Sequence, residues 1–254
     1  NKYTLLGGIR SAAQLTAYEI PLLVIVLSVV VLSGSFNVIE VIEFQADSGV
    51  WNIFLLPLGS VLFLVVMVAE VERIPFDMPE AEAELVEGWW TEYGGMRWGL
   101  MFASEYLRTY AACLLFAHFF LGGWEAPFED TIPFIHYIPH ITWVFLKAWF
   151  IFIFFVWFRA ALHRVRTDQI LEFGWRWLLP LSLVNLIIAT ALRLWVYDGI
   201  NGEWPILIPI LVTSISLVLF ILLSIDEDPE ALEAQTRPFS VQTVDVASPG
   251  QHRD

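Results

Sequence analysis

Long apolar segments dominate the sequence and limit what the chain can fold into. A transmembrane helix needs about 20 predominantly apolar residues to cross the hydrocarbon core of a bilayer. Such windows follow one another as far as residue 225, and they cover residues 13–32, 54–71, 98–121, 141–162, 177–197 and 204–225. The sequence therefore predicts an all-α integral membrane protein with about six transmembrane helices.

Composition supports this class and excludes others. Of the 254 residues, 57% are hydrophobic and 16% are charged, whereas about a quarter of the residues in soluble domains are charged. The single cysteine, Cys113, excludes a disulfide framework and a cysteine-ligated metal site. The histidines are scattered and there is no glycine-rich phosphate loop. Residues 1–225 are expected to form the membrane domain, and the acidic, proline-containing segment 226–254 is expected to be disordered.

The distribution of arginine predicts the orientation of the chain. Segments on the side of the N-terminus carry most of the basic residues, whereas the opposite segments carry almost none. Basic residues favour the cytoplasmic side of a membrane. We therefore expect the segments 73–97, 159–176 and 226–254 to be cytoplasmic.

Several ionisable residues fall inside or at the edge of these apolar windows. Glu19 lies in the first, Glu70 and Glu72 close the second, and Glu105 and Arg108 lie in the third. Such residues are costly in a bilayer and commonly mark ion or proton paths. A carboxylate in a low-dielectric setting has a raised pKa and can hold or pass a proton near neutral pH. We expect Glu19 to face a polar cavity. For Glu105, an ion pair with Arg108 one turn further along the helix is the structural alternative.

The connection between the second and third windows is acidic and contains two prolines. Pro79 suits the first position of a helix, on which Glu80, Glu84 and Glu87 then share one face. A charge run of this kind is usually a solvated surface. Here Pro75 and Pro79 make its approach more rigid than a solvating loop requires, which predicts an amphipathic cytoplasmic helix with a specific role.

One continuous motif gives a family resemblance. Residues 69–88 read A-E-V-E-R-I-P-F-D-M-P-E-A-E-A-E-L-V-E-G. This segment closely resembles the signature of the H subunit of the proton-pumping NADH:quinone oxidoreductases, the respiratory complex I family. Shorter matches to the same family occur in order at residues 1–7, 18–21, 92–93, 105–106, 120–124 and 164–169. The resemblance extends over about residues 1–197.

The resemblance implies a role at the quinone site of a multi-pass protein in the cell's inner membrane. Quinone would be the substrate, and the chain itself would bind no flavin, iron–sulfur cluster or metal. The expected partners are the hydrophilic arm, the antiporter-like membrane subunits and the lipid membrane, and no nucleic acid. The proton relay residues implied by the family are Glu19, Glu70, Glu82, Glu84 and Glu105. The residues implied to shape the quinone cavity are Arg73, Phe76, Asp77, Arg159, Arg164 and Arg166. For the last three arginines, simple anchoring at the cytoplasmic surface is an equal alternative.

Members of the family normally have further spans before the segment that begins at Asn1. We therefore expect either a fragment or a split gene that supplies the remainder. The related subunits of membrane-bound hydrogenases and deazaflavin-dependent reductases share the core of the motif and are the nearest alternative. Two other classes stay open: a stand-alone ion transporter, although internal repeats are not visible, and a structural anchor for soluble redox subunits.

Overall fold

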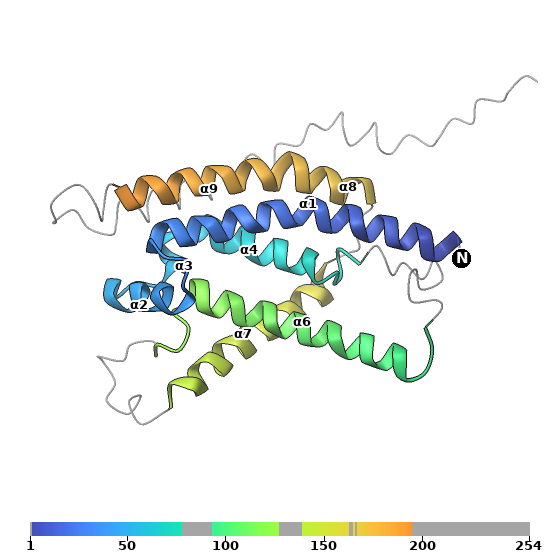
Figure 1. Ribbon diagram of the computed structural model, residues 1–254, viewed down its shortest axis with the longest axis horizontal. Coiled ribbons are helices and arrows are strands. Elements are labelled where there is room, and N and C mark those ends of the chain that lie inside the picture. Colours follow the sequence, from blue (N-terminus) through green and yellow to red (C-terminus); the bar gives the residue numbers. More distant parts are fainter. Residues whose placement is uncertain (1, 78–92, 127–138, 163–164, 166, 195–254) are drawn as a thin grey trace, which may run out of the picture. The chain divides into compact units, whose positions relative to one another are not determined.

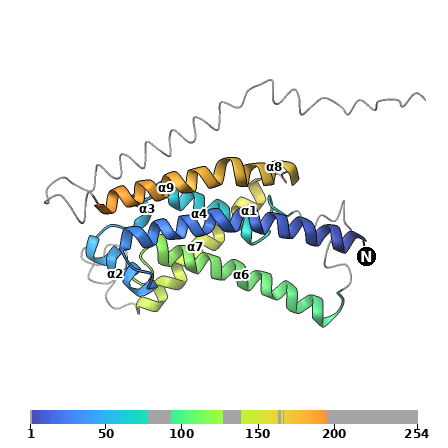
Figure 2. The same ribbon diagram turned by 45° about the horizontal axis from the view of Figure 1, so that its top comes forward.

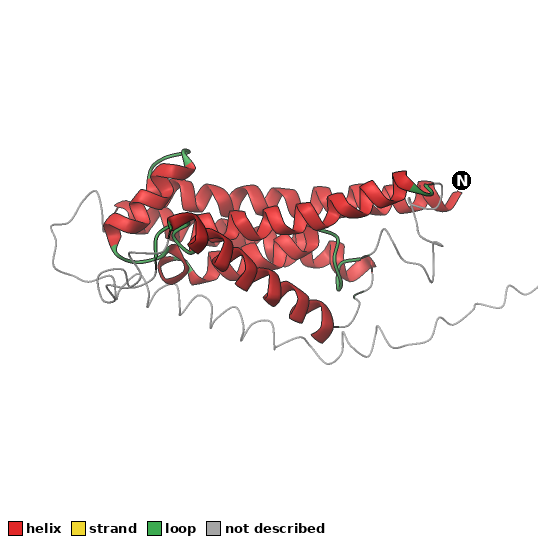
Figure 3. Ribbon diagram, turned by 90° about the horizontal axis from the view of Figure 1, so that it is seen from below, coloured by secondary structure: helices red, strands yellow, loops and turns green. Residues whose placement is uncertain are grey.

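The computed structural model describes residues 2–77, 93–126, 139–162, 165 and 167–194. The chain divides into two compact units, Asn1–Ser216 and Leu217–Asp254, and the described residues all belong to the first. Every regular element in these ranges is helical, as Figure 3 shows, so the all-α prediction is confirmed there. The helix expected at 204–225, the acidic connection from residue 78 and the tail from residue 226 lie outside the described residues.

Most of the predicted windows correspond to helices. The elements, labelled in Figure 1, are α1 (Lys2–Ser33), α2 (Val38–Ser48), α3 (Asn52–Leu55), α4 (Pro57–Glu70), α6 (Met96–Phe120), α7 (His140–Ala161), α8 (Thr167–Glu172), the π-helical η3 (Phe173–Leu178) and α9 (Leu179–Leu192). Three described helices are long and apolar enough to cross a membrane: Lys2–Ser33, His140–Ala161 and Gln169–Leu192. These helices indicate a multi-pass membrane protein, while the number of spans stays a prediction.

Helix α1 lies beside both α9 and α4 (Figures 1 and 2). Asn185 of α9 is fully buried, and its Nδ2 donates a hydrogen bond to Ser28 Oγ of α1 at 2.7 Å. A Cβ atom at Gly59 of α4 would lie 2.8 Å from Asn185 Nδ2. Small residues and interhelical hydrogen bonds allow membrane helices to approach closely, so these three residues fix α1, α4 and α9 against one another.

The segment between α1 and α4 differs from the prediction. The sequence indicated no helix before the second window, yet α2 forms there. Asn37 caps its N-terminus, because Asn37 Oδ1 accepts a hydrogen bond from the N–H of Ile39, and Gly49 ends it with φ 64°. The second window is itself interrupted at Leu56, between α3 and α4, and Pro57 occupies the first turn of α4, where a helix tolerates proline.

Two buried polar side chains organise the end of the bundle where α6 finishes. Lys147 Nζ of α7 donates hydrogen bonds to three backbone carbonyl oxygens, those of Leu121 (2.6 Å), Gly123 (3.0 Å) and Glu125 (2.6 Å). Gln45 Oε1 of α2 accepts hydrogen bonds from the N–H groups of Asn52 and Gly122, both at 3.1 Å, and Gln45 Nε2 donates to the carbonyl of His118 at 3.1 Å. The carbonyls in the last turn of a helix have no partner within the helix. Gln45 supplies a donor to the carbonyl of His118 in the last turn of α6, and Lys147 supplies donors to the C-cap Leu121 and to the chain that follows it.

Candidate functional site

The turn that follows α4 directs two charged side chains at α6. Its backbone is closed by hydrogen bonds from the N–H of Glu72 to the carbonyl of Ala69 (3.1 Å) and from the N–H of Phe76 to the carbonyl of Arg73 (2.7 Å). Glu72 has φ 55°, in the left-handed region that few residues other than glycine occupy. This reversal brings the consecutive side chains of Glu72 and Arg73 to α6.

Two ion pairs join the turn to α6. Arg73 Nη2 lies 3.4 Å from Glu105 Oε2, and Arg108 Nη2 lies 3.7 Å from Glu72 Oε2. The side chains of Arg73, Glu105 and Glu72 are 16%, 13% and 7% exposed, whereas that of Arg108 is 43% exposed. Glu105 and Arg108 thus each pair with a residue of the turn. The alternative prediction, an ion pair between Glu105 and Arg108 along α6, is wrong. We call these four residues the charge cluster.

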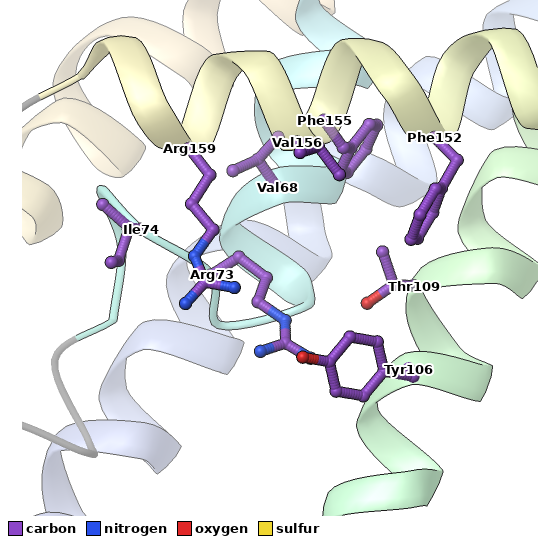
Figure 4. Close-up of a pocket in the computed structure, with 9 residues that line it drawn as sticks. All are labelled: Val68, Arg73, Ile74, Tyr106, Thr109, Phe152, Phe155, Val156 and Arg159. Atoms are coloured by element: carbon purple, nitrogen blue, oxygen red, sulfur yellow. The ribbon is translucent and has the colours of Figure 1, made fainter.

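A small cavity opens beside the charge cluster. The guanidinium carbon of Arg73 lies 4.6 Å from the centroid of the Tyr106 ring. Figure 4 shows the side chains of Arg73 and Arg159 entering the same region from the turn and from α7. The cavity has a volume of about 40 Å³, which admits a few water molecules. Its walls are formed by Val68, Arg73, Ile74, Tyr106, Thr109, Phe152, Phe155, Val156 and Arg159.

Two further carboxylates lie near the charge cluster. Glu70, at the end of α4, interacts electrostatically with Arg108, Glu19 and Glu72. Glu70 Oε2 is buried and has no hydrogen-bond partner within the described ranges. The side chain of Glu19 lies on an exposed face of α1. The structure therefore brings the sequence-predicted residues Glu19, Glu70 and Glu105 into one region. That Glu19 faces a polar cavity stays a prediction, because its side chain is exposed in the described part of the chain.

Sequence reasoning missed a row of polar residues on α1 that holds the turn. Ser11 Oγ donates a hydrogen bond to Glu72 Oε1 at 2.6 Å. Gln14 Nε2 donates to the carbonyls of Ala69 and Phe76, both at 2.9 Å. Tyr18 meets the ring of Phe76 edge to face, with centroids 5.6 Å apart. The spacing of Ser11, Gln14 and Tyr18 places them on one helical face, and this polar row in a largely apolar helix was the available signal.

The residues expected to shape the quinone cavity occupy different environments. Phe76 is buried against Tyr18, Asp77 is half-buried, and Arg159 is exposed at the rim of the small cavity. The N–H of Val165 donates to the carbonyl of Pro75 at 3.3 Å, so the segment after α7 reaches the turn. Glu82, Glu84, Arg164 and Arg166 lie outside the described residues. Within the described ranges, no three His, Cys, Asp or Glu side chains are grouped to hold a metal ion.

Long apolar helices, with charged residues paired between α6 and the turn after α4, define a multi-pass membrane protein. In this class such charges commonly mark ion or proton paths. A family model described as NADH dehydrogenase matches residues 1–190. The chain belongs to this family, within the group formed by the H subunits of NADH-quinone oxidoreductases.

Individual relatives agree with this assignment. The chain is 45% identical over 197 residues to the NADH-quinone oxidoreductase H subunit of Geobacillus kaustophilus, covering 78% of this chain and 57% of the relative. It is 45% identical over 193 residues to its counterpart in Anoxybacillus flavithermus, covering 76% and 56%. A chain of the membrane-bound sulfane sulfur reductase, an archaeal respiratory membrane complex, superposes with a TM-score of 0.64 at 25% identity, covering 74% of this chain and 61% of that chain. The chain spans a little over half the length of these two bacterial relatives.

Proposed function

We propose that this chain forms part of the quinone-binding cavity of an NADH:quinone oxidoreductase and part of the path that couples quinone reduction to proton translocation. The observation that carries the proposal is the charge cluster, with two carboxylates and two guanidinium groups paired between α6 and the turn after α4. Both residues that the turn contributes lie in the segment 69–88 that resembles the family signature, and Arg73 matches that signature.

The chemistry of the cluster suits a proton path. Each carboxylate pairs with an arginine on the neighbouring element, so protonating the carboxylate weakens the pair and frees the arginine to find another anion. Quinone reduction takes up protons and changes the charge in its cavity. Such a change can be passed on through Glu72 and Glu105 to Glu70 and Glu19, which lie in the same region. Glu82 and Glu84 complete the proposed relay.

The quinone cavity itself requires more than the described residues. Arg73, Phe76, Asp77 and Arg159 come from the turn and from the end of α7, which the hydrogen bond between Val165 and Pro75 holds close to one another. Arg164 and Arg166 belong to the same proposed surface. We propose that the hydrophilic arm meets this end of the bundle and delivers electrons, while antiporter-like membrane subunits receive the coupled signal. The chain then needs no flavin, iron–sulfur cluster or metal of its own.

Removing the gene for the chain tests this function. We expect inverted membrane vesicles from the deletion strain to lose NADH-driven quinone reduction and the accompanying acidification of their interior, and the wild-type gene to restore both. When the gene returned to the deletion strain carries Glu72→Gln, we expect the amount of assembled complex to recover more fully than the acidification of the vesicles. Vesicles that keep both activities after the deletion would contradict the proposal.

A second candidate function is supported by the likeness to the sulfane sulfur reductase chain. The chain would then serve a related respiratory complex that reduces an acceptor other than quinone. The 45% identity to the Geobacillus kaustophilus relative favours the quinone enzyme. The deletion strain separates the two candidates, because loss of an NADH-independent reduction with intact NADH:quinone activity would select the second.

The proposed cytoplasmic position of the charge cluster predicts a labelling pattern. In a chain whose buried Cys113 is first changed to serine, a cysteine at Leu162, 41% exposed beside the end of α7, should react with a membrane-impermeant maleimide only after the cells are opened. A cysteine at Phe36, 84% exposed between α1 and α2, should react in intact cells. The reversed pattern would place the cluster on the outer side.

A further inference from the structure

The geometry of the charge cluster depends on the turn after α4, which its backbone hydrogen bonds from Glu72 to Ala69 and from Phe76 to Arg73 close but do not attach to α1. Two consecutive residues, Glu72 and Arg73, must meet Arg108 and Glu105 at once, so a small rotation of the turn would break both ion pairs. Glu72 also adopts φ 55°. A residue other than glycine persists in such a conformation only where its surroundings impose it. Some contact from outside the turn must therefore fix it.

Gln14 of α1 provides that contact. Its side chain is buried, at 2% exposed, and its single Nε2 atom donates to the carbonyls of Ala69 and Phe76, each at 2.9 Å. These carbonyls stand at the two ends of the turn, seven residues apart in sequence. Because both neighbours are acceptors, the amide must present its nitrogen to them. Gln14 Oε1 has no hydrogen-bond partner in the described part of the chain. The two hydrogen bonds that Nε2 donates therefore account for the position of the Gln14 side chain.

We propose that Gln14 is the positioning residue of the charge cluster. It clamps both ends of the turn to α1 and thereby sets the register in which Glu72 meets Arg108 and Arg73 meets Glu105. The inference rests on the proposed function, because the register of the charge cluster affects coupling only if the cluster links quinone reduction to proton movement. Gln14 acts through the turn, because its Nε2 donates to the backbone carbonyls of Ala69 and Phe76 and not to the charged side chains of the cluster.

The test replaces Gln14 by methionine in the complete complex. Methionine has nearly the same length and fills the same space, but it donates no hydrogen bond. Each lost hydrogen bond changes an equilibrium by about fivefold, so two together shift the balance between this turn and other conformations by roughly 25-fold. We expect assembled complex with a proton-to-electron ratio reduced by at least about half. Gln14→Asn keeps the amide but is one methylene shorter and reaches one carbonyl at most, so it should give an intermediate ratio.

Gln45→Met is the matched control. Gln45 is equally buried, at 1% exposed, and makes hydrogen bonds to the carbonyl of His118 and to the N–H groups of Asn52 and Gly122, but it lies at the other end of α6. We expect this change to lower the amount of complex while each assembled complex keeps the wild-type ratio.

The outcomes separate this inference from the function on which it rests. If Glu105→Gln leaves the proton-to-electron ratio unchanged, the proposed function fails. Suppose that Glu105→Gln uncouples the complex while Gln14→Met and Gln45→Met both keep the wild-type proton-to-electron ratio. The positioning role of Gln14 is then rejected, and the proposed function stands. Should Gln14→Met fail to assemble, Gln14→Asn decides, because a wild-type ratio in that assembled variant overturns the inference.

Discussion

Changing Glu105 to glutamine is expected to stop most quinone-linked proton translocation while the complex still assembles. Glutamine keeps the size and hydrogen-bonding capacity of the side chain but cannot release a proton. Glu105 is 13% exposed and pairs with Arg73 at 3.4 Å. If the carboxylate relays protons, its loss interrupts the path, because Glu105 is the carboxylate that α6 presents to Arg73 in the charge cluster.

The competing view is that Glu105 only compensates the charge of Arg73. Removing one partner of a buried ion pair costs roughly 3–5 kcal/mol when the other charge is left buried. Arg73 retains a contact with the ring of Tyr106 at 4.6 Å and some exposure to solvent, which reduces this cost. On this view assembly should fall, and the activity of each remaining complex should be normal.

A double substitution distinguishes the two roles. Quinone reductase activity and proton translocation are measured in one membrane preparation and divided by the amount of assembled complex. Adding Arg73→Gln to Glu105→Gln removes the uncompensated charge, so it should restore assembly on the structural view. On the relay view the single variant already assembles, and the second change should leave the amount of complex nearly the same. Glu172→Gln is the control, since Glu172 is 55% exposed and pairs with Arg176 on the protein surface, where such pairs contribute at most about 1 kcal/mol.

The sequence predicted the bounds of α6 and α7 well from the extent of their apolar windows, whereas α1 begins at Lys2, eleven residues before its window at 13–32. The windows at 98–121 and 141–162 differ from α6 and α7 by one or two residues at each end. Helix α2 was missed because 11 residues are too few for a spanning segment, although Asn37 and Gly49 carried the capping signals. The π-helical η3 was also missed, since no local residue pattern specifies it. Its Gly174 lies against α1, where an added Cβ would be 3.3 Å from that of Ala17.

The sequence showed that all four residues of the charge cluster are ionisable residues in or beside apolar windows, but it did not show which of them pair. The family resemblance implied roles for Glu70, Arg73 and Glu105, whereas spacing along α6 suggested a local pair between Glu105 and Arg108. The observed partners come from another element, and separation in the sequence gives no information about such contacts. Gln14 escaped notice for a related reason: it carries no charge, so the cost of burying it in a membrane helix drew no attention. Its two hydrogen bonds reach residues 55 and 62 positions away.

Changing Lys147 to methionine is expected to lower the amount of assembled complex several-fold, with normal activity in what remains. The ammonium group of Lys147 is the donor for three carbonyls at the end of α6 and lies 4.8 Å from the centroid of the Trp51 ring. Hydrogen bonds to a charged group contribute about 1.5–3 kcal/mol each. The cost of burying the ammonium offsets part of this sum, which leaves a loss of roughly 3 kcal/mol. Losses of that size change protein abundance several-fold.

The position of Lys147 predicts that its loss affects assembly and leaves coupling normal. It serves the end of α6 remote from the charge cluster, where Gly122 and Gly123 adopt φ 69° and 49° and turn the chain sharply. Lys2→Met is the control, because Lys2, the other lysine of the chain, is exposed near the start of α1. Immunoblots of native gels give the amount of complex, and vesicle acidification gives the coupling per complex. A Lys147→Met complex that assembles at the wild-type level but no longer translocates protons would contradict the structural role and place Lys147 in the proton path, since a helix cap has no means of affecting coupling from that end of the bundle.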